Sequence, residues 1–328
     1  MAQHFLLSAR ARSLTVAAVL RTADKECEAT FAALRWADTD GKLVCPHCGC
    51  PTCYEARRPN GALRFRCKAC RKAFSLTSGT LFAFHKLELR TYLAAVVIFC
   101  NEVKGKSALA LSRELGVQYK TAFVLAHKLR EAMATEMKGH RLGGGGEVVE
   151  VDGAYFGGYV KPANRKEDRK DRRRAENRSG KRKCVVVIRQ RDGRTLPNAF
   201  ATEAAAVSFI KARVAAETEI HADEASSWDA LHARYVVKRI NHQVAYSEDG
   251  THTNGAESFF SRMRRGEVGH HHVAGAYLAR YAQEAGWRED RRRDPNGAQV
   301  RRVVGLALAA PPSVDFCGYW QRATGNAG

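Results

Sequence analysis

The chain has 328 residues, of which 45% are hydrophobic, so it can fold into two or three domains with at least one full-sized core. Its net charge of +20 favours a polyanionic partner, because each lysine or arginine placed against a phosphate releases a condensed counterion. A membrane partner is the weaker alternative, since the sequence contains no run of about 18 uncharged apolar residues and no lipidation motif. Composition therefore favours a nucleic-acid-binding protein.

The first part of the chain, residues 1–40, is expected to be helical. Arginines interrupt its apolar stretches, and we interpret it as mature sequence and not as a signal peptide. Ten cysteines are present, and six of them fall between Cys45 and Cys70. In the absence of a secretion signal, this clustering indicates metal binding in a reducing compartment rather than a disulfide framework.

Two CxxC pairs, Cys45 with Cys48 and Cys67 with Cys70, are separated by 18 residues. A Zn²⁺ ion takes four ligands in a tetrahedron, and two such turns can each supply two thiolates. The linking stretch contains a Pro-Asn-Gly turn between strand-like runs, which is typical of a β-hairpin. The spacing therefore predicts a zinc ribbon over residues 41–80.

The zinc ligand set has alternatives in the same segment. A further CxxC pair is formed by Cys50 and Cys53, and His47 is also a possible ligand. Two-residue gaps and symmetric turns favour the set of Cys45, Cys48, Cys67 and Cys70. The interpretation without a metal, in which the cysteines are small buried residues, fits this spacing poorly.

Helical periodicity begins after the zinc ribbon, and residues 85–140 are predicted to form a helix-turn-helix-like DNA-binding region. The sequence indicates helices over 87–101, 106–115 and 119–137, with Gly116 just past the end of the second. The exposed face of the third helix is expected to offer three polar side chains to DNA: Gln118, Lys120 and Lys128. Leu142 and the glycines at 143–146 are expected to form a flexible linker at a domain boundary.

The remainder, residues 147–290, alternates between strand and helix patterns and predicts an α/β domain. Strands are expected at 148–152, 184–189, 195–200, 219–223 and 236–240, and helices at 203–214 and 254–265. Two of these strands end on an acid, Asp152 and Asp223, and the last helix carries Glu257. This is the order in which ribonuclease-H-like folds bring carboxylates together. We therefore predict a multidomain α+β protein with a C-terminal RNase H-like domain.

The three acids suit metal-dependent chemistry at a phosphodiester. Two Mg²⁺ ions held by carboxylates can activate an attacking oxygen and neutralise a leaving one. Asp223 and Glu257 are separated by 33 residues, which is near the spacing of Asp-Asp-Glu transposases. Arg264 lies seven positions after Glu257 and so returns to nearly the same helix face. Arg264 and the adjacent Arg265 are predicted to contact DNA phosphate beside the site.

Several sequence blocks resemble those of zinc-ribbon-bearing transposases of bacterial insertion sequences, the ISXO2-like family. They are CPHCG…FRCKACRKAFSLTSGTLF, VEVDGAYFGG, HADEASSW and HTNGAESFFSRMRRG…HHHVAGAYLARYAQEAGWR, and they span about residues 35–288. The resemblance implies a catalytic triad of Asp152, Asp223 and Glu257 that depends on Mg²⁺ or Mn²⁺. It also implies action on double-stranded DNA at the element's terminal inverted repeats, a homo-oligomer in the synaptic complex, and a cytoplasmic, nucleoid-associated location.

The sequence departs from the family pattern at three positions. Gly153 stands where related sequences often carry an acid, Arg264 replaces the more usual lysine, and Phe260 sits where a tryptophan is common. Some relatives use the asparagine of the HxN motif, here Asn254, in place of a third acid. Either Asn254 or Glu257 can therefore complete the site.

Three other segments carry charge or histidine. Residues 161–183 hold 12 Lys/Arg against 4 Asp/Glu, a net of +8, and Arg172, Arg173 and Arg174 in this loop are predicted to contact phosphate. No ligand role is expected for the histidines at 270–272. Residues 291–328 are expected to be a C-terminal tail.

Two other functions are compatible with these features. One is a zinc-ribbon and helix-turn-helix DNA-binding regulator whose RNase H-like domain is silent. The other is a structure-specific nuclease on the same fold. The presence of all three acids argues against the regulator.

Overall fold

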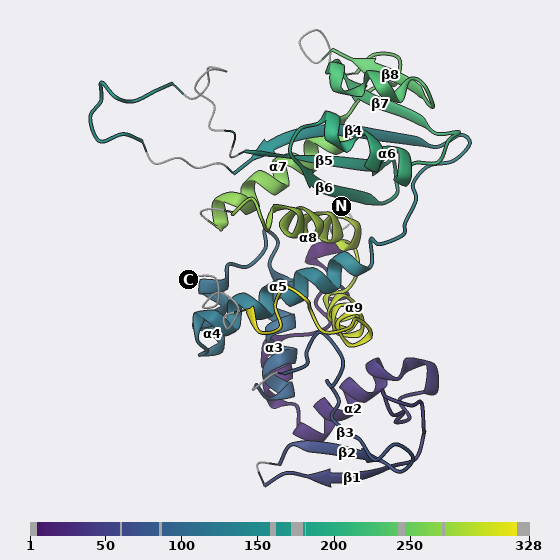
Figure 1. The fold of residues 1–328 in the computed structure, drawn as a ribbon, viewed down its shortest axis with the longest axis vertical. Helices are drawn as coiled ribbons and strands as arrows, with labels where there is room; N and C mark the ends of the chain where they lie inside the picture. The colour runs from purple at the N-terminus through teal and green to yellow at the C-terminus, as the bar shows by residue number, and fades with distance from the viewer. Residues whose placement is uncertain are drawn as a thin grey trace. The chain divides into compact units, whose positions relative to one another are not determined.

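A computed structural model of the chain describes residues 5–59, 61–84, 87–157, 162–171, 180, 182–241, 247–270 and 273–319 (Figure 1). The chain divides into two compact units: unit 1 comprises residues 1–136 and 291–328, and unit 2 comprises residues 137–290. None of the described helices is long and apolar enough to cross a membrane.

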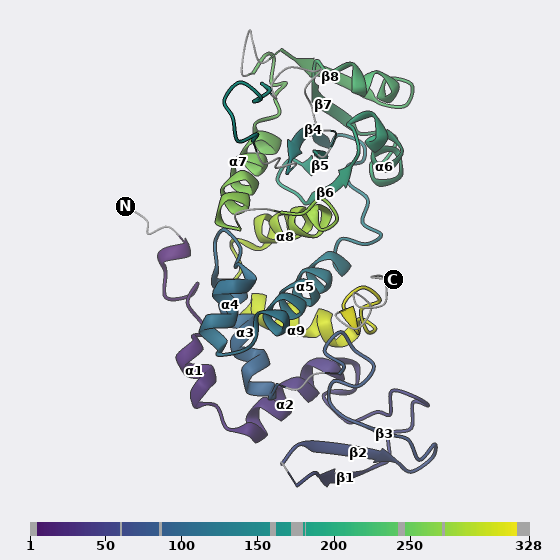
Figure 2. The ribbon, with the colours of Figure 1, turned by 60° about the vertical axis from the view of Figure 1, so that its left-hand side comes forward.

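Unit 1 is helical apart from one small sheet (Figures 1 and 2). Its helical segments are η1 (Phe5–Leu7), α1 (Val16–Arg21), α2 (Asp24–Arg35), η2 (Ala37–Thr39), α3 (Leu89–Asn101), α4 (Ala108–Leu115), α5 (Tyr119–Thr135) and α9 (Asn296–Ala309). The short helix α4 has clear end signals, because the Ser107 hydroxyl accepts from the Ala110 amide at 3.2 Å and Gly116 ends the helix at a φ of 64°. The order of a short helix, a glycine turn and a longer helix is therefore present in α4 and α5.

The small sheet of unit 1 consists of β1 (Cys53–Arg57), β2 (Leu63–Cys67) and β3 (Ala73–Phe74), in antiparallel order β1-β2-β3. It packs on the helical segment that precedes it. The Phe65 ring contacts Trp36 edge-on with ring centroids 6.3 Å apart, and Arg57 donates two hydrogen bonds to Glu28 of α2 at 2.9 and 2.7 Å.

The prediction of a tail after residue 290 is wrong, because α9 is a core helix of unit 1. Its apolar residues recur at helical spacing and are buried: Val300, Val303, Val304, Ala307 and Leu308. They pack against α2, α3 and α5. After α9, Phe316 is buried and its ring stacks on that of His127 in α5, with centroids 4.8 Å apart. The last part of the chain thus covers a face of α5.

Unit 2 is built on a five-stranded sheet in the order β6-β5-β4-β7-β8. The strands are β4 (Val148–Phe156), β5 (Lys183–Gln190), β6 (Thr195–Phe200), β7 (Glu219–Asp223) and β8 (Val236–Ile240). The pairs β4–β5 and β5–β6 are antiparallel, whereas β4–β7 and β7–β8 are parallel. The helical segments are η4 (Ala204–Ala206), α6 (Val207–Arg213), η5 (Ser226–Leu231), α7 (Asn254–Gly269) and α8 (Leu278–Arg291).

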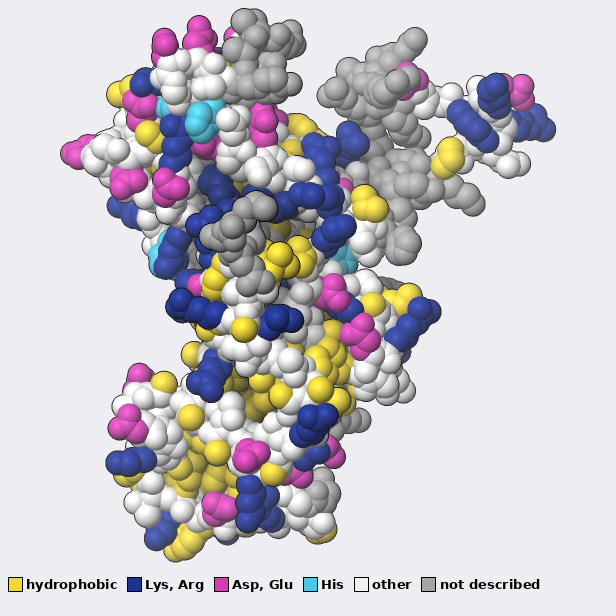
Figure 3. Space-filling model, turned by 180° about the vertical axis from the view of Figure 1, so that it is seen from behind, with side chains coloured by type: hydrophobic (Ala, Val, Ile, Leu, Met, Phe, Trp, Pro, Cys, Tyr) yellow, Lys and Arg dark blue, Asp and Glu magenta, His cyan; other side chains and the backbone are white. Residues whose placement is uncertain are grey.

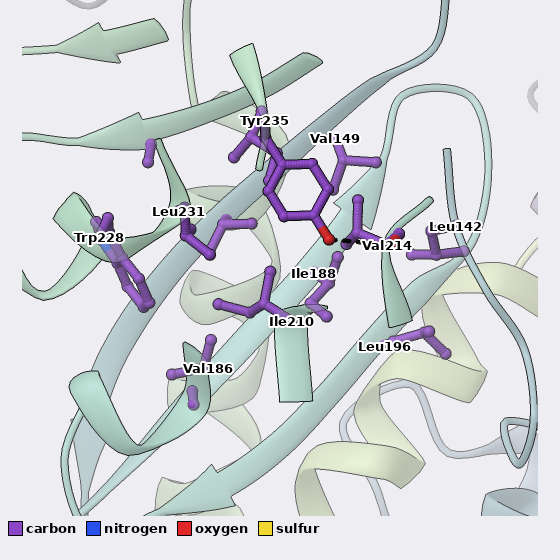
Figure 4. Close-up of a cluster of buried hydrophobic side chains, with 14 of the residues drawn as sticks. Leu142, Val149, Val186, Ile188, Leu196, Ile210, Val214, Trp228, Leu231 and Tyr235 are labelled. Carbon is purple, nitrogen blue, oxygen red and sulfur yellow. Dashed lines mark hydrogen bonds between the residues drawn. The ribbon is translucent and has the colours of Figure 1, made fainter. Parts of the chain in front are cut away.

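Alternating residues of the central strands bury both faces of this sheet. On one face Val149 and Val151 of β4 pack with Ile210 of α6 and with Trp228, and the Tyr235 hydroxyl donates to the Val214 carbonyl at 3.1 Å (Figure 4). On the other face Ala154 and Phe156 of β4 pack with the aromatic residues of α7 and with α8. Asp152 and Ala154 are two residues apart in β4, so their side chains leave the strand on the same face, and the Cβ of Asp152 projects towards α7.

The predicted linker at residues 142–146 is anchored in unit 2, so the prediction of flexibility is wrong. Leu142 is buried, its amide donates to the Arg213 carbonyl at 2.7 Å, and its carbonyl accepts from Ala215 at 2.9 Å. Gly144 donates to the Thr218 hydroxyl at 3.0 Å. The boundary between the units lies earlier, after Glu136.

The burial of α9 makes a testable prediction about stability. Val304 is fully buried, so Val304→Asp should destabilise unit 1 by at least about 3 kcal/mol, since an unpaired charge would enter an apolar core. Arg301→Asp on the exposed side of the same helix is the matched control and should change stability by less than about 1 kcal/mol. Urea denaturation of both variants measures this, and equal stability of the two would contradict a core role for α9.

Candidate catalytic and metal sites

Four cysteine thiols of the small sheet form a compact group. The Sγ atoms of Cys45 and Cys70 are 3.7 Å apart, those of Cys48 and Cys67 are 3.5 Å apart, and all four lie within 4.8 Å of one another. With Zn–S bonds of about 2.3 Å, a tetrahedral ion holds its sulfurs about 3.8 Å apart. The donor set and its dimensions therefore fit Zn²⁺.

The alternative ligands lie outside this group. The Cys50 thiol is 3.6 Å from the Thr52 carbonyl, and the Cys53 thiol is 3.9 Å from the Cys50 carbonyl. His47 is exposed, and neither Cys50 nor Cys53 belongs to the group of thiols within 4.8 Å of one another. The ligand set predicted from the two CxxC pairs is the one that the structure assembles.

Two of the three predicted acids lie next to each other on paired strands of unit 2. The parallel pairing of β4 with β7 joins Val151 to Ala222, so the next residues, Asp152 and Asp223, are neighbours at the point where β7 ends. The prediction that the first strand also ends on its acid is wrong, because β4 continues past Asp152 to Phe156 through its pairing with β5. Glu257 comes from the first turn of α7, which packs on β4. The acids influence one another electrostatically. They are less tightly grouped than the cysteines, which are the one set of potential ligands within 4.8 Å of one another among the described residues.

Asp152 lies in an environment that disfavours its charge. Burial raises its pKa to about 7, and the negative charges of Asp223, Glu257 and Glu203 act in the same direction. The Gly153 amide, which donates to the Asp152 carboxylate at 2.7 Å, opposes the shift only in part. Negative charge is therefore concentrated around Asp152, and no lysine or arginine is among the groups that shift its pKa.

Asp223 is oriented by the loop that follows it. The indole Nε1 of Trp228 donates to Oδ1 of Asp223 at 2.7 Å, and the Ala225 amide donates to the same oxygen at 3.3 Å. Trp228 is fully buried in the core under the sheet. The rigid core thus fixes the direction of this carboxylate.

The helix that carries Glu257 is held by a buried carboxylate of β4. Glu150, only 2% exposed, accepts from the Ala256 amide at 2.9 Å, whereas the N-cap residue Thr253 makes no side-chain cap. A Cβ at Gly255 would lie 2.7 Å from the Glu150 carboxylate, so glycine is needed for this approach. The negative charge also suits the positive end of the helix dipole. Glu150 therefore fixes the first turn of α7 against the strand that carries Asp152.

A polar network surrounds this contact. The Nδ1 atom of His221 accepts from Arg191 at 2.9 Å and from the His252 amide at 3.2 Å, so the ring proton lies on Nε2, which donates to Glu219 at 2.7 Å. Arg191 also lies 3.4 Å from Glu150 and donates to the His252 carbonyl at 3.3 Å. The segment that leads into α7 is thereby fixed to the sheet.

The other predicted residues of α7 lie along its exposed side. Asn254 and Glu257 are three positions apart in the first turn and are neighbours on the helix surface. Arg264 and Arg265 are exposed, and the Arg264 guanidinium lies 5.4 Å from the ring centre of Phe156. Farther along, Glu267 accepts from the Gly157 amide at 3.0 Å, which ties this part of the helix to the end of β4.

Among the predicted DNA contacts of α5, one is misplaced. Gln118 and Lys120 are exposed at the start of the helix, but Lys128 is 6% exposed and its ammonium lies 3.3 Å from the Ala83 carbonyl. The prediction that Lys128 faces solvent is wrong, because residues after 290 cover this part of α5. Of the remaining predictions, Arg172, Arg173, Arg174, His271 and His272 lie outside the described residues, and the His270 ring contacts Tyr281 edge-on.

The sequence interpretation missed two acids, Glu150 and Glu203. A charged residue within the apolar strand VVEVD was a signal for Glu150, because a carboxylate there must be either buried and satisfied or functional. Glu203, which precedes η4, stands in an alanine-rich run that carries no such signal.

The zinc site leads to a prediction about metal content. Cys67→Ser should reduce the bound zinc from one equivalent per chain to near zero and unfold the small sheet, because so small a sheet has little core of its own. Cys50→Ser is the matched control and should keep the zinc and the fold. Atomic absorption and limited proteolysis give the two readouts, and equal loss in both variants would show that the ligand set is different.

The environment of Asp152 leads to a prediction about stability and pH. A folded-state pKa near 7, above the unfolded value of about 3.9, means that stability is lost as the pH rises between these values. At pH 8, without added Mg²⁺ or Mn²⁺, Asp152→Asn should therefore be more stable than the parent chain, by at most about 4 kcal/mol. The difference should disappear near pH 4. Thermal unfolding of both chains at both pH values tests this, and equal stability of the variant and the parent chain at pH 8 would contradict it.

Comparison with known families identifies two domains in the chain. Residues 22–73 match the model of a transposase zinc-ribbon domain, and residues 141–290 match that of an ISXO2-like transposase domain. The chain is also 23% identical over 290 residues to an uncharacterized protein in the transposable element ISH50 of Halobacterium salinarum. The aligned region covers 85% of this chain and 95% of that relative. No solved structure matches the chain.

The first match includes the four cysteines whose thiols group together, and the second contains Asp152, Asp223 and Glu257. Both domains occur here in the order that the sequence blocks predicted. The chain belongs to the family of ISXO2-like transposases that carry an N-terminal zinc ribbon.

Proposed function

We propose that the protein binds the terminal inverted repeats of an insertion sequence and catalyses divalent-metal-dependent DNA cleavage and strand transfer. The observation that carries this proposal is the position of Asp152 and Asp223 next to each other on the paired strands β4 and β7, close enough to Glu257 for its charge to add to the effect of burial on the pKa of Asp152. The match to a transposase domain over residues 141–290 supports the same reaction.

We infer an RNase H-like fold for unit 2. The support is its sheet order β6-β5-β4-β7-β8, with three antiparallel strands followed by two parallel ones and helices on both faces. In this arrangement the central strand, β4, carries the first acid, and its parallel neighbour, β7, carries the second.

The residues at this sheet end fit Mg²⁺ or Mn²⁺. Carboxylate oxygens are hard ligands of the kind that both ions prefer. The pKa of Asp152 is raised by burial and then by neighbouring negative charge, and a divalent cation would neutralise that charge. We assign Asp152, Asp223 and Glu257 as the residues that hold the cations, with Asn254 as a neighbouring oxygen donor in the same helical turn.

When bound, such cations would activate the oxygen that attacks the phosphodiester and neutralise the charge on the oxygen that leaves. The chain's own contribution is orientation. Trp228 directs the Asp223 carboxylate, Glu150 fixes the first turn of α7, and both act from within the packed core of unit 2. The attacking groups are water in cleavage and a DNA 3′-hydroxyl in strand transfer.

Arginine and lysine side chains are the proposed contacts to the DNA backbone. Several are close together on the face of unit 2 that is seen in Figure 3. Arg264 and Arg265 are exposed on the helix of Glu257, and Lys120 is exposed at the start of α5. We assign the same role to Arg172, Arg173 and Arg174 from their charge alone. The zinc ribbon and α4–α5 are the proposed readers of the inverted repeats, in a synaptic homo-oligomer.

A strand-transfer assay with duplexes that carry the element's ends tests this function. Asp152→Asn and Asp223→Asn should each lower Mg²⁺-dependent cleavage and joining at least about a hundredfold, because cation binding at the reacting phosphate is worth several kcal/mol. Asp192→Asn, in an exposed hairpin turn, is the control and should keep full activity.

Parallel assays of Glu257→Gln and Asn254→Ala identify which residue of α7 completes the site, since the essential one should show the larger loss. Full activity of both Asp152→Asn and Asp223→Asn would contradict the catalytic assignment. Cleavage without joining by the parent chain would indicate a nuclease instead of a transposase.

A further inference from the structure

One face of the small sheet in unit 1 carries small, aromatic and basic side chains and no acid. The register of β1 with β2 places Tyr54 opposite Arg66 and Ala56 opposite Arg64. Backbone hydrogen bonds continue this pairing past both ends of the two strands, and alternate residues of a strand project to the same face. We call this surface the basic face, and it comprises Tyr54, Ala56, Arg58, Ala62, Arg64, Arg66 and Lys68.

The opposite face of the sheet is already occupied within unit 1. Phe65 is buried there, with its ring centroid 6.3 Å from that of Trp36 and 5.4 Å from that of Phe74. Arg57 projects to the same side and donates two hydrogen bonds to Glu28 of α2. These contacts fix the hairpin and direct the basic face away from the core that it packs on.

The cations of the basic face are open to solvent and have no acid beside them. Arg58, Arg66 and Lys68 are exposed, and Arg64 is half-buried. Among the described residues, none of the four forms an ion pair. Residues 57–72 hold seven Lys/Arg and no Asp/Glu. Burial and the charge of Arg58 both lower the pKa of Arg64, so the like charges are close enough to repel each other.

Three of these cations form a row along β2 that suits a regular polyanion. Arg64, Arg66 and Lys68 are two residues apart in sequence, so at about 3.3 Å per residue the row is about 13 Å long. At about 3.4 Å per nucleotide of one DNA strand, this length covers about four phosphates. The Lys68 ammonium lies 4.8 Å from the centre of the Tyr54 ring, which is 60% exposed. The ring therefore holds Lys68 on the face through a cation–π contact.

We propose that the basic face binds the phosphate backbone of double-stranded DNA without reading its bases. This inference rests on the proposed function, because it defines how the zinc ribbon takes part in holding the ends of the element. Contacts to phosphate fix the register of a protein on the duplex but carry no sequence information. Cys67 projects to the opposite face of β2, so a zinc ion would fix the hairpin without covering the row of cations.

The salt dependence of DNA binding by the zinc-loaded full chain tests the proposal. Fluorescence anisotropy with a labelled mixed-sequence duplex of about 25 base pairs gives the affinity at each salt concentration. Arg58→Gln/Arg64→Gln should lower the slope of log K against log salt concentration by nearly 2, and should weaken binding by about 10–100-fold at about 0.1 M salt. The matched control Lys25→Gln/Arg301→Gln removes two exposed charges from α2 and α9 and should keep the parental slope.

A second pair of variants separates loss of charge from loss of structure. Arg58→Lys/Arg64→Lys keeps both charges and should keep the slope and the affinity within about threefold. Zinc content and circular dichroism verify the fold of each variant. On a duplex that carries one end of the element, Arg58→Gln/Arg64→Gln should lose affinity by the same factor as on the mixed-sequence duplex, because phosphate contacts are independent of sequence.

The outcomes distinguish this inference from the function on which it rests. If the parent chain binds duplex DNA and Arg58→Gln/Arg64→Gln keeps the parental slope, the role of the basic face is refuted and the proposed function stands. A loss confined to the duplex with the element's end would refute the backbone role, and an equal loss in Lys25→Gln/Arg301→Gln would show that overall charge is responsible. If the parent chain binds neither duplex, the proposed function itself is wrong.

Discussion

The organisation of unit 2 depends on one contact between a strand and a helix, the hydrogen bond from the Ala256 amide of α7 to the buried Glu150 carboxylate of β4. This carboxylate replaces the missing side-chain cap of α7, and Gly255 makes the approach possible. Because Glu150 and Asp152 lie on the same strand and the same face, the contact links the helix that carries Glu257 to the strand that carries the first acid. Removing Glu150 would leave a buried helix end unsatisfied, and the third acid would lose its fixed relation to the other two.

This anchoring lets unit 2 concentrate negative charge at one end of its sheet. The acids come from a strand, a second strand and a helix, and each is oriented by a different part of the core: Asp152 by its own strand, Asp223 by Trp228 and Glu257 through Glu150. Such charge lowers the stability of the cation-free fold, which is a common cost of a preorganised site. Glycine recurs where these groups approach closely, since both Gly153 and Gly255 adjoin a carboxylate that a Cβ would displace. The four clustered cysteines belong to unit 1 and form a separate candidate metal site.

Local patterns were sufficient to predict the five strands of unit 2, the helices α6 and α7 and the four cysteines whose thiols group together, because spacing and alternation reflect local backbone geometry directly. They did not predict α8 or the continuation of β4 beyond Asp152. They were insufficient where a residue's role depends on a distant partner. Lys128 has the appearance of an exposed helical lysine, but residues near Phe316 cover it. The apolar positions of α9 recur at 300, 303, 304, 307 and 308, so this helix was predictable from periodicity, whereas its packing on α2, α3 and α5 was not.

The central claim is that the carboxylates of Asp152 in β4 and of Asp223 at the end of β7, together with α7, form one divalent-cation site. Anomalous diffraction from a crystal of the zinc-loaded chain soaked in Mn²⁺ measures this most directly, because the metal positions are located independently of activity. The account predicts a manganese peak bound by Asp152 and Asp223, with a ligand from α7, and a separate zinc peak among Cys45, Cys48, Cys67 and Cys70. A well-ordered sheet end without a manganese peak, or a peak held by other residues, would contradict it.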